Sequence, residues 1–376
     1  MNLRRPRMTD SRIGAALYKF SYKLDPVLLG IAFMFTILGL FVLYSASETN
    51  ITRPLAQLMN YILAFTCLWC TTYLPPNLLK RFAIPLYLLG IVLLIGVYFF
   101  GDVSKGARRW LNIGVMRIQP SEIMKIALPL SLAWLFDHQQ NEINFKTFTL
   151  AIIMMLVPGL LILKQPDLGT TILVFSSGFY ILFFAGLPWK IISAVIATIG
   201  AAAPFLWHTL HDYQRKRIMV LLDPSEDPLG AGYHIIQANI ALGSGGTVGK
   251  GWLNGSQTHL DFLPEKHTDF IFAVFGEEFG LIGAIVLVLL YFALISRGLF
   301  IARYASSLFE RLLASAITLS FFTYAIVNMG MVSGILPVVG VPLPFISYGG
   351  TALVTLFLGI GILMSIHANK KLMANT

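Results

Sequence analysis

Apolar residues occur along most of this chain in long runs that short polar stretches interrupt. Ten of these runs are about 17 to 25 residues long, the length that a helix needs to cross roughly 30 Å of hydrocarbon. The pattern therefore predicts an all-α fold, a polytopic integral membrane bundle of about ten transmembrane helices. The expected spans are residues 26–45, 57–74, 81–100, 120–137, 148–164, 168–186, 191–208, 269–295, 311–335 and 348–367.

The spans leave three polar stretches within one integral membrane domain, residues 1–376. Residues 1–25 and 368–376 are interpreted as cytoplasmic tails, and residues 209–268 as a long outer loop between the seventh and eighth spans. The N-terminal stretch lacks the order of basic, apolar and small residues that marks a cleaved signal peptide, so the first span is expected to be retained. No repeat of fixed period is present, which would have indicated a solenoid or an array.

Lys and Arg in short loops predict the orientation, because these residues are retained in the cytoplasm. With ten spans, the basic residues of the N-terminal stretch and of alternate short loops all fall on one side. Both termini are therefore expected in the cytoplasm. The residues are Arg4, Arg5, Arg7, Arg12, Lys19, Lys23, Lys80, Arg81, Lys190, Arg297, Arg303, Arg311, Lys370 and Lys371.

Composition agrees with the membrane class. Hydrophobic residues make up 56% and charged residues 12% of the chain, more apolar surface than a soluble core absorbs. The net charge is +9, but much of it lies on the cytoplasmic side and no nucleic-acid motif accompanies it, so no nucleic-acid partner is expected. Cys67 and Cys70 lie inside the second span without a second ligand pair, so they are interpreted as packing residues.

Two outer loops carry basic residues against the topological rule. Residues 101–120 contain four cations, Arg108 and Arg109 among them, and residues 209–268 contain five, including Lys250. Cations held outside favour an anionic ligand at the outer leaflet. The alternative is that a long loop is translocated whatever its charge.

Charged residues within the expected spans give a sharper signal, since an unpaired charge in the bilayer is costly. Glu122 and Lys125 lie three residues apart, on one face of the fourth span near its outer end. They are candidates for chemistry, with mutual pairing as the alternative. Lys164 and Asp167 flank Pro166 at an outer turn, where capping and turn formation are the favoured explanation and a substrate role is the alternative.

The stretch PEKHTDFIFAVFGEEFGLIG at the eighth span concentrates charge. Asp269 is expected in the first helical turn, where the positive end of the helix stabilises a carboxylate. Capping does not explain the neighbouring Glu265, Lys266 and His267, nor the two glutamates at 277–278, which would be costly against lipid. This helix is therefore expected to be buried on most sides.

The segment PVVGVPLPFISYGG, residues 337–350, has no ionisable side chain. It is expected to form a wall of the cavity, with Ser347 or Tyr348 hydrogen-bonded to a sugar. The alternative is that its prolines and glycines only shape the turn into the last span.

Three longer motifs resemble the SEDS family of bacterial cell-wall glycosyltransferases. They are DPSEDPLGAGYHIIQANIALGSGG, GWLNGSQTHLDFLPEKHTDFIFAVFGEEFGLIG and NMGMVSGILPVVGVPLPFISYGGTALV. The resemblance runs from the first span to the C-terminus, and the last two motifs are closer to the rod-shape members of the family than to the division members. Ala352 stands where many rod-shape members have Ser.

The resemblance implies a ten-helix enzyme that polymerises lipid II at the outer face of the bacterial cytoplasmic (inner) membrane during elongation. It implies Asp269 as the essential carboxylate, with Glu122 and Lys125 also involved in activity. It further implies a divalent cation, Mg²⁺ or Mn²⁺, whose ligands stay unassigned, and no organic cofactor. The implied partners are a class B penicillin-binding protein and other membrane proteins of the elongation machinery.

The residues suit this chemistry. Arg108, Arg109, Lys125 and Lys250 are candidates for the pyrophosphate of lipid II, and Asp269 for a general base in an inverting transfer. The other candidates for substrate contact are Glu265, Lys266, His267 and Ser347. The alternative function is a flippase for a lipid-linked precursor, but a transporter predicts charges at the membrane midplane and usually a repeat. Here the polar clusters gather at the outer boundary.

Overall fold

The computed structural model describes residues 23–104, 107–113, 116–140, 143–209, 212–227, 230–260, 262–263 and 265–373. The basic residues predicted from Arg4 to Lys19, and Lys105 of the first outer loop, lie outside these described residues.

All ten expected spans are helices. Seven helices of the described part are long and apolar enough to cross a membrane, and two further apolar helices are shorter, so the chain is a multi-pass membrane protein. The ten are α2 (Pro26–Ala46), α3 (Thr52–Tyr73), α4 (Pro76–Phe100), α5 (Pro120–His138), α6 (Phe145–Leu163), α7 (Leu168–Phe184), α8 (Trp189–Thr209), α12 (Ile271–Arg303), α13 (Leu308–Val332) and α14 (Thr351–Met373).

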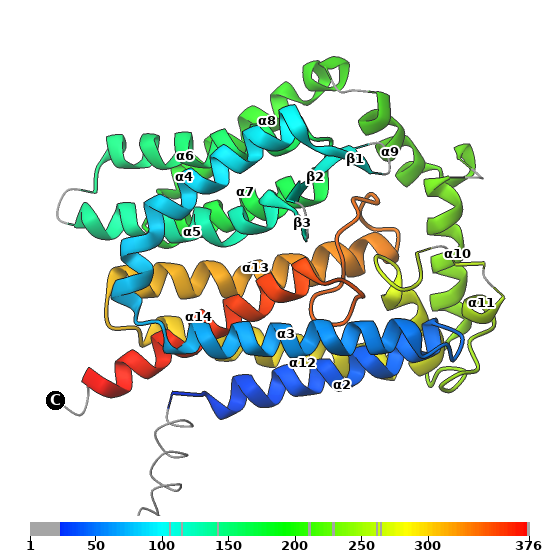
Figure 1. Cartoon of the computed structure of the whole chain (residues 1–376). Coiled ribbons are helices and arrows are strands. Elements are labelled where there is room, and N and C mark those ends of the chain that lie inside the picture. Colours follow the sequence, from blue (N-terminus) through cyan, green and yellow to red (C-terminus); the bar gives the residue numbers. More distant parts are fainter. Residues whose placement is uncertain are drawn as a thin grey trace, which may run out of the picture.

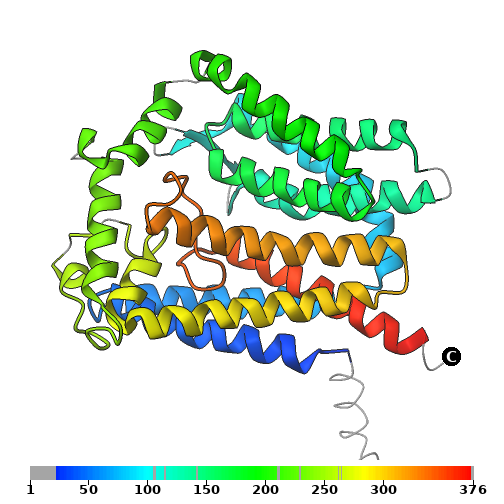
Figure 2. The same ribbon diagram turned by 180° about the vertical axis from the view of Figure 1, so that it is seen from behind.

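The helices form two groups on either side of a central pair. Figures 1 and 2 show α4 to α8 in one group and α2, α3 and α12 in the other, with α13 and α14 between them. Helix α14 packs along α3, and α13 contacts α12, α7 and α5. Of the seven helices of spanning length, α13 and α14 are therefore the best buried, with two-thirds of their apolar windows inside the protein.

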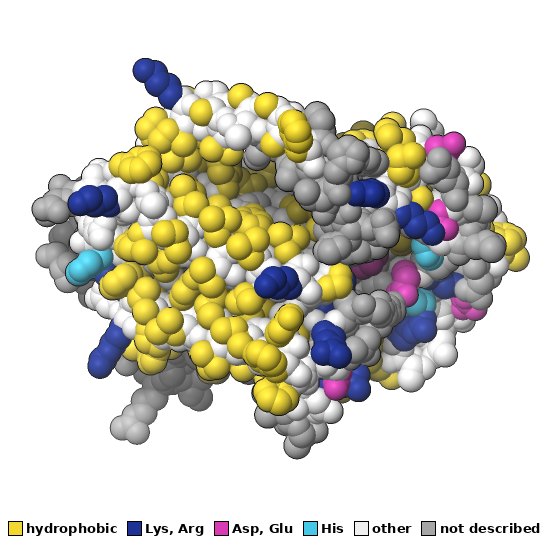
Figure 3. Space-filling model, turned by 90° about the horizontal axis from the view of Figure 1, so that it is seen from above, with side chains coloured by type: hydrophobic (Ala, Val, Ile, Leu, Met, Phe, Trp, Pro, Cys, Tyr) yellow, Lys and Arg dark blue, Asp and Glu magenta, His cyan; other side chains and the backbone are white. Residues whose placement is uncertain are grey.

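The surface is that of a membrane protein. Hydrophobic side chains spread over the middle of the face in Figure 3, and the Asp and Glu side chains seen there gather toward one end. Large apolar side chains such as Phe100, Val92 and Ile37 are mostly exposed, which is favourable only against hydrocarbon.

The first outer loop contains a small sheet that the sequence analysis did not predict. Strands β1 (Asp102–Ser104), β2 (Ala107–Ile113) and β3 (Met116–Ile118) pair antiparallel in the order β1-β2-β3. Their short length and basic residues hid the alternating pattern by which a strand is recognised. The sheet places Arg108 and Arg109, neighbours in β2, on opposite faces.

The long outer segment is also partly helical. It contains α9 (Asp212–Leu222), a 3-10 turn (Pro224–Glu226), α10 (Ala231–Ser244) and the short α11 (Ser256–His259). In Figure 1, α9, α10 and α11 lie across one end of the bundle, beside the start of α12. This end carries the outer loops of the predicted topology, and the short basic loops lie at the other.

Helix α12 changes character at Gly280, whose φ of 62° and ψ of −161° interrupt the helix. Residues 271–278 are all buried, whereas Leu281 and Ile282 beyond the kink are exposed. The expectation of a helix buried on most sides is thus confirmed for its first part. The helix begins at Ile271, so Asp269 precedes it rather than lying in its first turn, because residues 265–270 form turns of their own.

Residues 333–350 connect α13 to α14 without regular structure, deep among the helices. Irregular backbone at this depth is tolerated only where protein side chains satisfy it. Tyr61 and Tyr291 donate their hydroxyls to the carbonyls of Phe345 and Pro344, both at 2.6 Å. Gln57 donates to the Ser347 carbonyl at 3.2 Å. Helices α3 and α12 therefore hold this segment in place.

Candidate active site

A polar cavity of about 260 Å³ lies where the outer ends of α5, α7, α12 and α14 meet residues 340–350. It brings together Asp269, Glu122, Lys125 and Arg109, four of the predicted site residues from three separate parts of the chain. Asp167 lines the same cavity, so two cations face three carboxylates. We call it the catalytic cavity. Its other lining residues are Trp110, Gln119, Thr170, Leu173, Thr268, Gly340, Val341, Pro342, Tyr348, Gly349, Gly350, Thr351 and Ala352.

The backbone of Asp269 is held in place by a side chain of a neighbouring helix. The side-chain nitrogen of Asn328, in α13, lies 2.8 Å from the Asp269 carbonyl oxygen. Beyond the carboxylate lies Gly340, at which an added Cβ would meet the Asp269 Oδ2 at 3.5 Å. Gly340 also has a φ of 72°, which a residue with a side chain rarely adopts. Glycine at this position therefore keeps the space beside the carboxylate open.

Glu122, in the first turn of α5, and Lys125, in the next turn, form an ion pair at 2.6 Å between Oε1 and Nζ. Their side chains are only 9% and 8% exposed. Lys125 also lies over the ring of Tyr324, 5.0 Å from its centroid, which adds a favourable cation–π contact. The second oxygen of Glu122 is buried and has no hydrogen-bond partner among the described residues. The two charges thus pair with each other, while the second carboxylate oxygen of Glu122 can still accept a hydrogen bond or bind a cation.

Asp167 has two roles at once. Its carboxylate caps α7 by accepting from the Thr170 amide at 3.1 Å and the Thr170 hydroxyl at 2.9 Å. The capping role read from the sequence is confirmed, but Asp167 also lines the catalytic cavity. Arg109 lies alongside, 3.7 Å from Asp167 and donating to the Pro166 carbonyl at 2.7 Å. Contact with the substrate was the less favoured interpretation of this turn, and only the fold brings Asp167 to the cavity.

The prediction that residues 337–350 form a wall of the cavity is confirmed, because Gly340, Val341, Pro342 and Tyr348 line it. Ser347 itself does not line the cavity. Its hydroxyl donates to the Thr268 carbonyl at 2.6 Å and accepts from the Leu343 amide at 2.8 Å. Ser347 therefore ties the wall to the stretch that carries Asp269.

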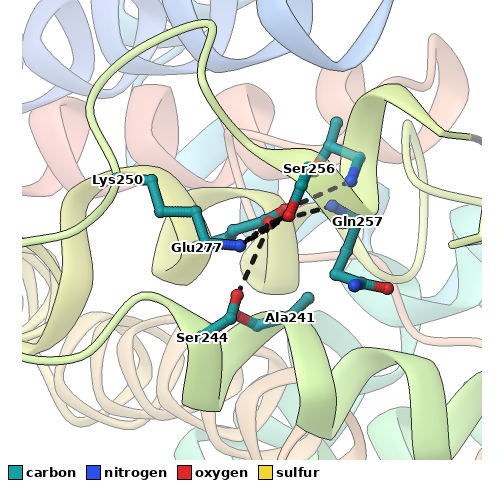
Figure 4. A network of polar contacts seen from close by, with 7 residues as sticks. Ala241, Ser244, Lys250, Ser256, Gln257 and Glu277 are labelled. Atoms are coloured by element: carbon teal, nitrogen blue, oxygen red, sulfur yellow. Dashed lines mark hydrogen bonds and ion pairs between the residues drawn. The ribbon is translucent and has the colours of Figure 1, made fainter.

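Lys250 lies outside the catalytic cavity and is paired with Glu277, at 2.8 Å. Figure 4 shows the buried Glu277 carboxylate as the centre of a network from residues 244–258. Besides Lys250, it accepts from the Gln257 amide at 2.9 Å and from the amide and hydroxyl of Thr258 at 3.1 and 2.9 Å. The structure thus gives Lys250 and Glu277 a part in fixing the outer segment on α12.

The kink in α12 is filled by the same outer segment. The carbonyls of Glu277 and Glu278 accept from the amides of Lys250 and Gly251, each at 3.0 Å. On the far side of the kink, the Leu281 amide donates to the Gly246 carbonyl at 3.0 Å. Backbone groups that a continuous helix would satisfy internally are therefore satisfied by residues 246–251.

The remaining predicted residues lie elsewhere. Arg108 is exposed on the sheet and is not part of the catalytic cavity. Glu265, Lys266 and His267 line a second, larger polar cavity next to the first, which we call the outer polar cavity. The Lys266 ammonium donates to the Thr258 carbonyl at 2.9 Å and pairs with Glu48 at 2.5 Å.

An apolar groove of about 640 Å³ adjoins the catalytic cavity. Its walls come from α3, α4, α5 and α14, with apolar side chains such as Leu63, Phe82 and Leu358. The groove and the catalytic cavity share Gln119, Glu122, Gly350 and Thr351, so the two lie side by side. A site with cations thus adjoins a surface suited to a hydrocarbon chain.

Comparison with known proteins gives a match over nearly the whole chain. The model of the FtsW/RodA/SpoVE family, described as cell cycle proteins, matches residues 26–372. Peptidoglycan glycosyltransferase MrdB of Escherichia coli K12 is 48% identical over 354 residues, 94% of this chain and 96% of that protein. A probable peptidoglycan glycosyltransferase FtsW of Geobacter metallireducens is 37% identical, covering 92% and 95% of the two chains.

Solved structures agree. One solved chain matches with a TM-score of 0.82, at 29% identity, over 92% of this chain and 98% of that one. Its structure is described as showing the structural coordination of polymerization and crosslinking by a peptidoglycan synthase complex. The rod shape determining protein RodA of Thermus thermophilus matches with a TM-score of 0.70, at 26% identity, over 91% and 96% of the two chains. The fold and the likeness to the rod-shape members are thereby confirmed.

Proposed function

This chain belongs to the FtsW/RodA/SpoVE family and is a peptidoglycan glycosyltransferase, and we propose that it polymerises lipid II into β-1,4-linked glycan strands during cell elongation. The observation that carries the substrate proposal is that the apolar groove adjoins the catalytic cavity and shares four lining residues with it. Lipid II has a hydrocarbon tail, a pyrophosphate and a sugar, in that order. The apolar groove lies next to the cavity that holds the cations and the carboxylates, as the tail of lipid II is joined to its polar head.

We propose Asp269 as the general base. The 4-hydroxyl of the acceptor sugar gives its proton to the Asp269 carboxylate as its oxygen attacks the anomeric carbon of the donor. The bond from that carbon to the pyrophosphate oxygen breaks, and the lipid pyrophosphate leaves with the electron pair. Inversion of an α-linked donor gives a β-linked product, so one base is sufficient and no carboxylate nucleophile is required.

Arg109 and Lys125 are the cations placed to stabilise the leaving pyrophosphate, since both line the catalytic cavity. Lys125 is almost buried, so its charge acts in a medium where screening is weak. Glu122 holds Lys125 in position through the 2.6 Å contact. Lys250 was predicted for the pyrophosphate, but its pairing with Glu277 supports a structural role instead.

A divalent cation is also proposed. Among the described residues no cluster of three His, Cys, Asp or Glu side chains forms a metal site. Mg²⁺ is commonly held by one or two carboxylates together with substrate phosphates and water, and the unpartnered Glu122 oxygen and the Asp269 carboxylate fit that role. When bound, the cation would neutralise charge that develops on the pyrophosphate.

The proposal extends to the setting. We place the protein in the bacterial inner membrane with both termini in the cytoplasm, because the cations of its short loops lie at the end opposite the catalytic cavity. Its proposed partners are a class B penicillin-binding protein that crosslinks the new strands and other membrane proteins of the elongation machinery. The similarity to a chain of a synthase complex that polymerises and crosslinks supports this pairing.

A defined polymerisation assay tests the function. Purified protein is given lipid II with Mg²⁺ or Mn²⁺, with and without the penicillin-binding partner. We expect polymer from the wild type and none from Asp269→Ala or Asp269→Asn. Asp223→Asn is the matched control, because Asp223 is an exposed carboxylate outside both cavities, and it should retain activity.

Normal polymer from Asp269→Ala would remove Asp269 from the role of base. No polymer from the wild type, even with a competent partner, would contradict polymerisation and favour a flippase. Translocation of lipid II across liposomes would then be the deciding assay.

A further inference from the structure

The reaction joins two saccharides, but the catalytic cavity is too small to hold both. Its volume of about 260 Å³ is below the range of roughly 300–1,000 Å³ that encloses one drug-sized ligand. It therefore accommodates the reacting atoms of the two substrates and little more. The bulk of at least one saccharide must lie outside it.

The outer polar cavity has the volume that the catalytic cavity lacks, about 820 Å³. It lies between the turn that joins α2 to α3, residues 46–53, and the stretch before α12, residues 263–267. The two cavities share one stretch of backbone: Glu265, Lys266 and His267 line the outer one, whereas Thr268 and Asp269 line the catalytic one. A ligand in the outer cavity thus lies next to the proposed base.

The shared backbone is held in place from the side of the catalytic cavity. The Tyr348 amide donates to the His267 carbonyl at 2.9 Å, and the Ser347 hydroxyl to the Thr268 carbonyl at 2.6 Å. Lys266 fixes the opposite side through the Thr258 carbonyl, at 2.9 Å. The wall between the cavities is therefore well ordered, and a ligand on one side can be placed accurately against a group on the other.

The lining of the outer polar cavity suits a saccharide with its peptide. Asn50 and Thr52 offer amide and hydroxyl groups, and Glu48, Glu265 and Arg53 offer charged acceptors and donors. The Ser47 hydroxyl, also in the lining, is buried and has no hydrogen-bond partner among the described residues. Sugar hydroxyls and acetamide groups both donate and accept, so they can satisfy such a mixed surface.

Two of the lining residues adopt unusual backbone conformations. Glu48 and Glu265 each have a φ of 52°, and Thr49 beside the cavity has a φ of 63°. Left-handed conformations cost free energy for residues other than glycine and are concentrated at functional sites. Their occurrence on both sides of one cavity agrees with a binding role.

The position of the apolar groove indicates where the donor and the acceptor bind. The donor loses its lipid pyrophosphate, so its pyrophosphate must face Arg109 and Lys125 and its tail must lie in the groove that adjoins them. No residue of the outer polar cavity lines that groove. We propose that the outer polar cavity binds the disaccharide-peptide of the acceptor and presents its 4-hydroxyl to Asp269. This inference rests on the proposed function.

Photo-crosslinking tests the site without requiring turnover. The full chain carries Asp269→Ala and a benzophenone amino acid in place of Thr52, an exposed residue that lines the outer polar cavity. The matched control carries the same amino acid in place of Asn254, which is exposed on the outer segment and lines neither cavity. The probe is a fluorescent, lipid-free N-acetylglucosaminyl-N-acetylmuramyl pentapeptide.

We expect the probe to crosslink at position 52 and not at 254, and excess unlabelled disaccharide pentapeptide to abolish the signal. Equal crosslinking at both positions, or none at 52, would overturn the proposal. Because the protein in this experiment cannot use Asp269, the result does not depend on whether Asp269 is the base.

A bulky side chain gives a second readout in protein with Asp269 intact. Thr52→Trp should lower the polymerisation rate at limiting lipid II about tenfold, or about 1.4 kcal/mol in binding, while Asn254→Trp leaves it unchanged. Wild-type rates from Thr52→Trp would contradict the acceptor site. If Asp269→Ala polymerises normally while Thr52→Trp is impaired, the proposed base is wrong and the acceptor site stands.

Discussion

The side-chain amide of Asn328 joins the backbone of Asp269 to the wall that faces it. Its Nδ2 lies 2.8 Å from the Asp269 carbonyl oxygen and 2.7 Å from that of Val341. Asn328 is completely buried within α13, and its hydrogen bond to the Val341 carbonyl is buried while that to the Asp269 carbonyl is partly buried. One side chain of a membrane-spanning helix therefore sets the spacing between two parts of the catalytic cavity.

Replacing this amide should impair both stability and catalysis. Asn328→Leu keeps the volume but removes the donor from both carbonyls, at a cost of about 1–3 kcal/mol for the buried carbonyl of Val341. We expect a lower melting temperature in detergent and a lower kcat, with little change in the KM for lipid II, because Asn328 does not line the cavity.

Ser320→Ala is the control for Asn328→Leu. It removes a hydroxyl from the same helix. The hydrogen bond that the structure gives for this hydroxyl is to the Ala316 carbonyl, one turn away. Ser320→Ala should leave kcat unchanged. A wild-type kcat in Asn328→Leu would show that the two carbonyls keep their positions without the amide.

Variants of the buried ion pair of Glu122 and Lys125 can separate an effect on stability from an effect on activity. Lys125→Met leaves the Glu122 carboxylate buried without its partner, which should destabilise the protein by about 3–5 kcal/mol. The double variant Glu122→Gln, Lys125→Met removes both charges and should regain most of that stability.

Polymerisation should stay absent in the double variant, because the cation proposed for the leaving group is still missing. Thermal unfolding and the lipid II assay measured on the same samples distinguish the two effects. If activity returned together with stability, Glu122 and Lys125 would be structural residues only.

The pairing of Lys250 with Glu277 makes a prediction about the outer segment. Glu277→Gln keeps the shape of the side chain but removes the charge that six hydrogen-bond donors around it share. Residues 244–258 should exchange their amide hydrogens faster in this variant, as hydrogen–deuterium exchange would measure.

Lys250→Met should give a similar but smaller effect, since the Lys250 side chain is 28% exposed and the other donors to Glu277 remain. Its KM for lipid II should not change. A large rise in KM with normal hydrogen exchange would instead assign Lys250 to the pyrophosphate, as the sequence first suggested.

The kink at Gly280 predicts a strong effect from one methyl group. An added Cβ at this position would lie 2.3 Å from the Gly249 amide nitrogen and 2.8 Å from the Thr247 carbonyl oxygen, and the φ of 62° is itself unfavourable. Gly280→Ala should therefore displace residues 246–251 and reduce both stability and polymerisation.

Gly243→Ala provides the contrast, because Gly243 lies in α10 with nothing within 4 Å of an added Cβ. It should be neutral or stabilise by about 0.5–1 kcal/mol, as Ala does within a helix. Comparable loss in both variants would indicate that the outer segment tolerates no change at all, rather than a specific steric clash at Gly280.

Some features of this protein followed from local pattern alone. The ten helices were predicted because a hydrophobic run of spanning length leaves the backbone no alternative in lipid. Asp269, Glu122 and Lys125 were selected for a related reason, since charges near lipid are costly enough to require a purpose or a partner. The three longer motifs, in their order along the chain, were then sufficient to identify the family.

Other features depended on contacts between distant residues. The sheet at residues 102–118 has strands too short to give a period, and Arg109 reaches the cavity only because that sheet folds over the turn at Pro166. The pairing of Lys250 with Glu277 joins residues 27 apart in sequence, and a lone lysine in a glycine-rich segment does not reveal it.

The sequence by itself determined which segments cross the membrane and which ionisable residues required an explanation, because both follow from the free energy of moving single residues into hydrocarbon. Only the tertiary structure decided how these residues are shared between two cavities. That division depends on where Asn328, Ser347 and Tyr348 bind the backbone around Asp269. Such hydrogen bonds join separate helices and loops, and their partners are fixed by packing rather than by any local pattern.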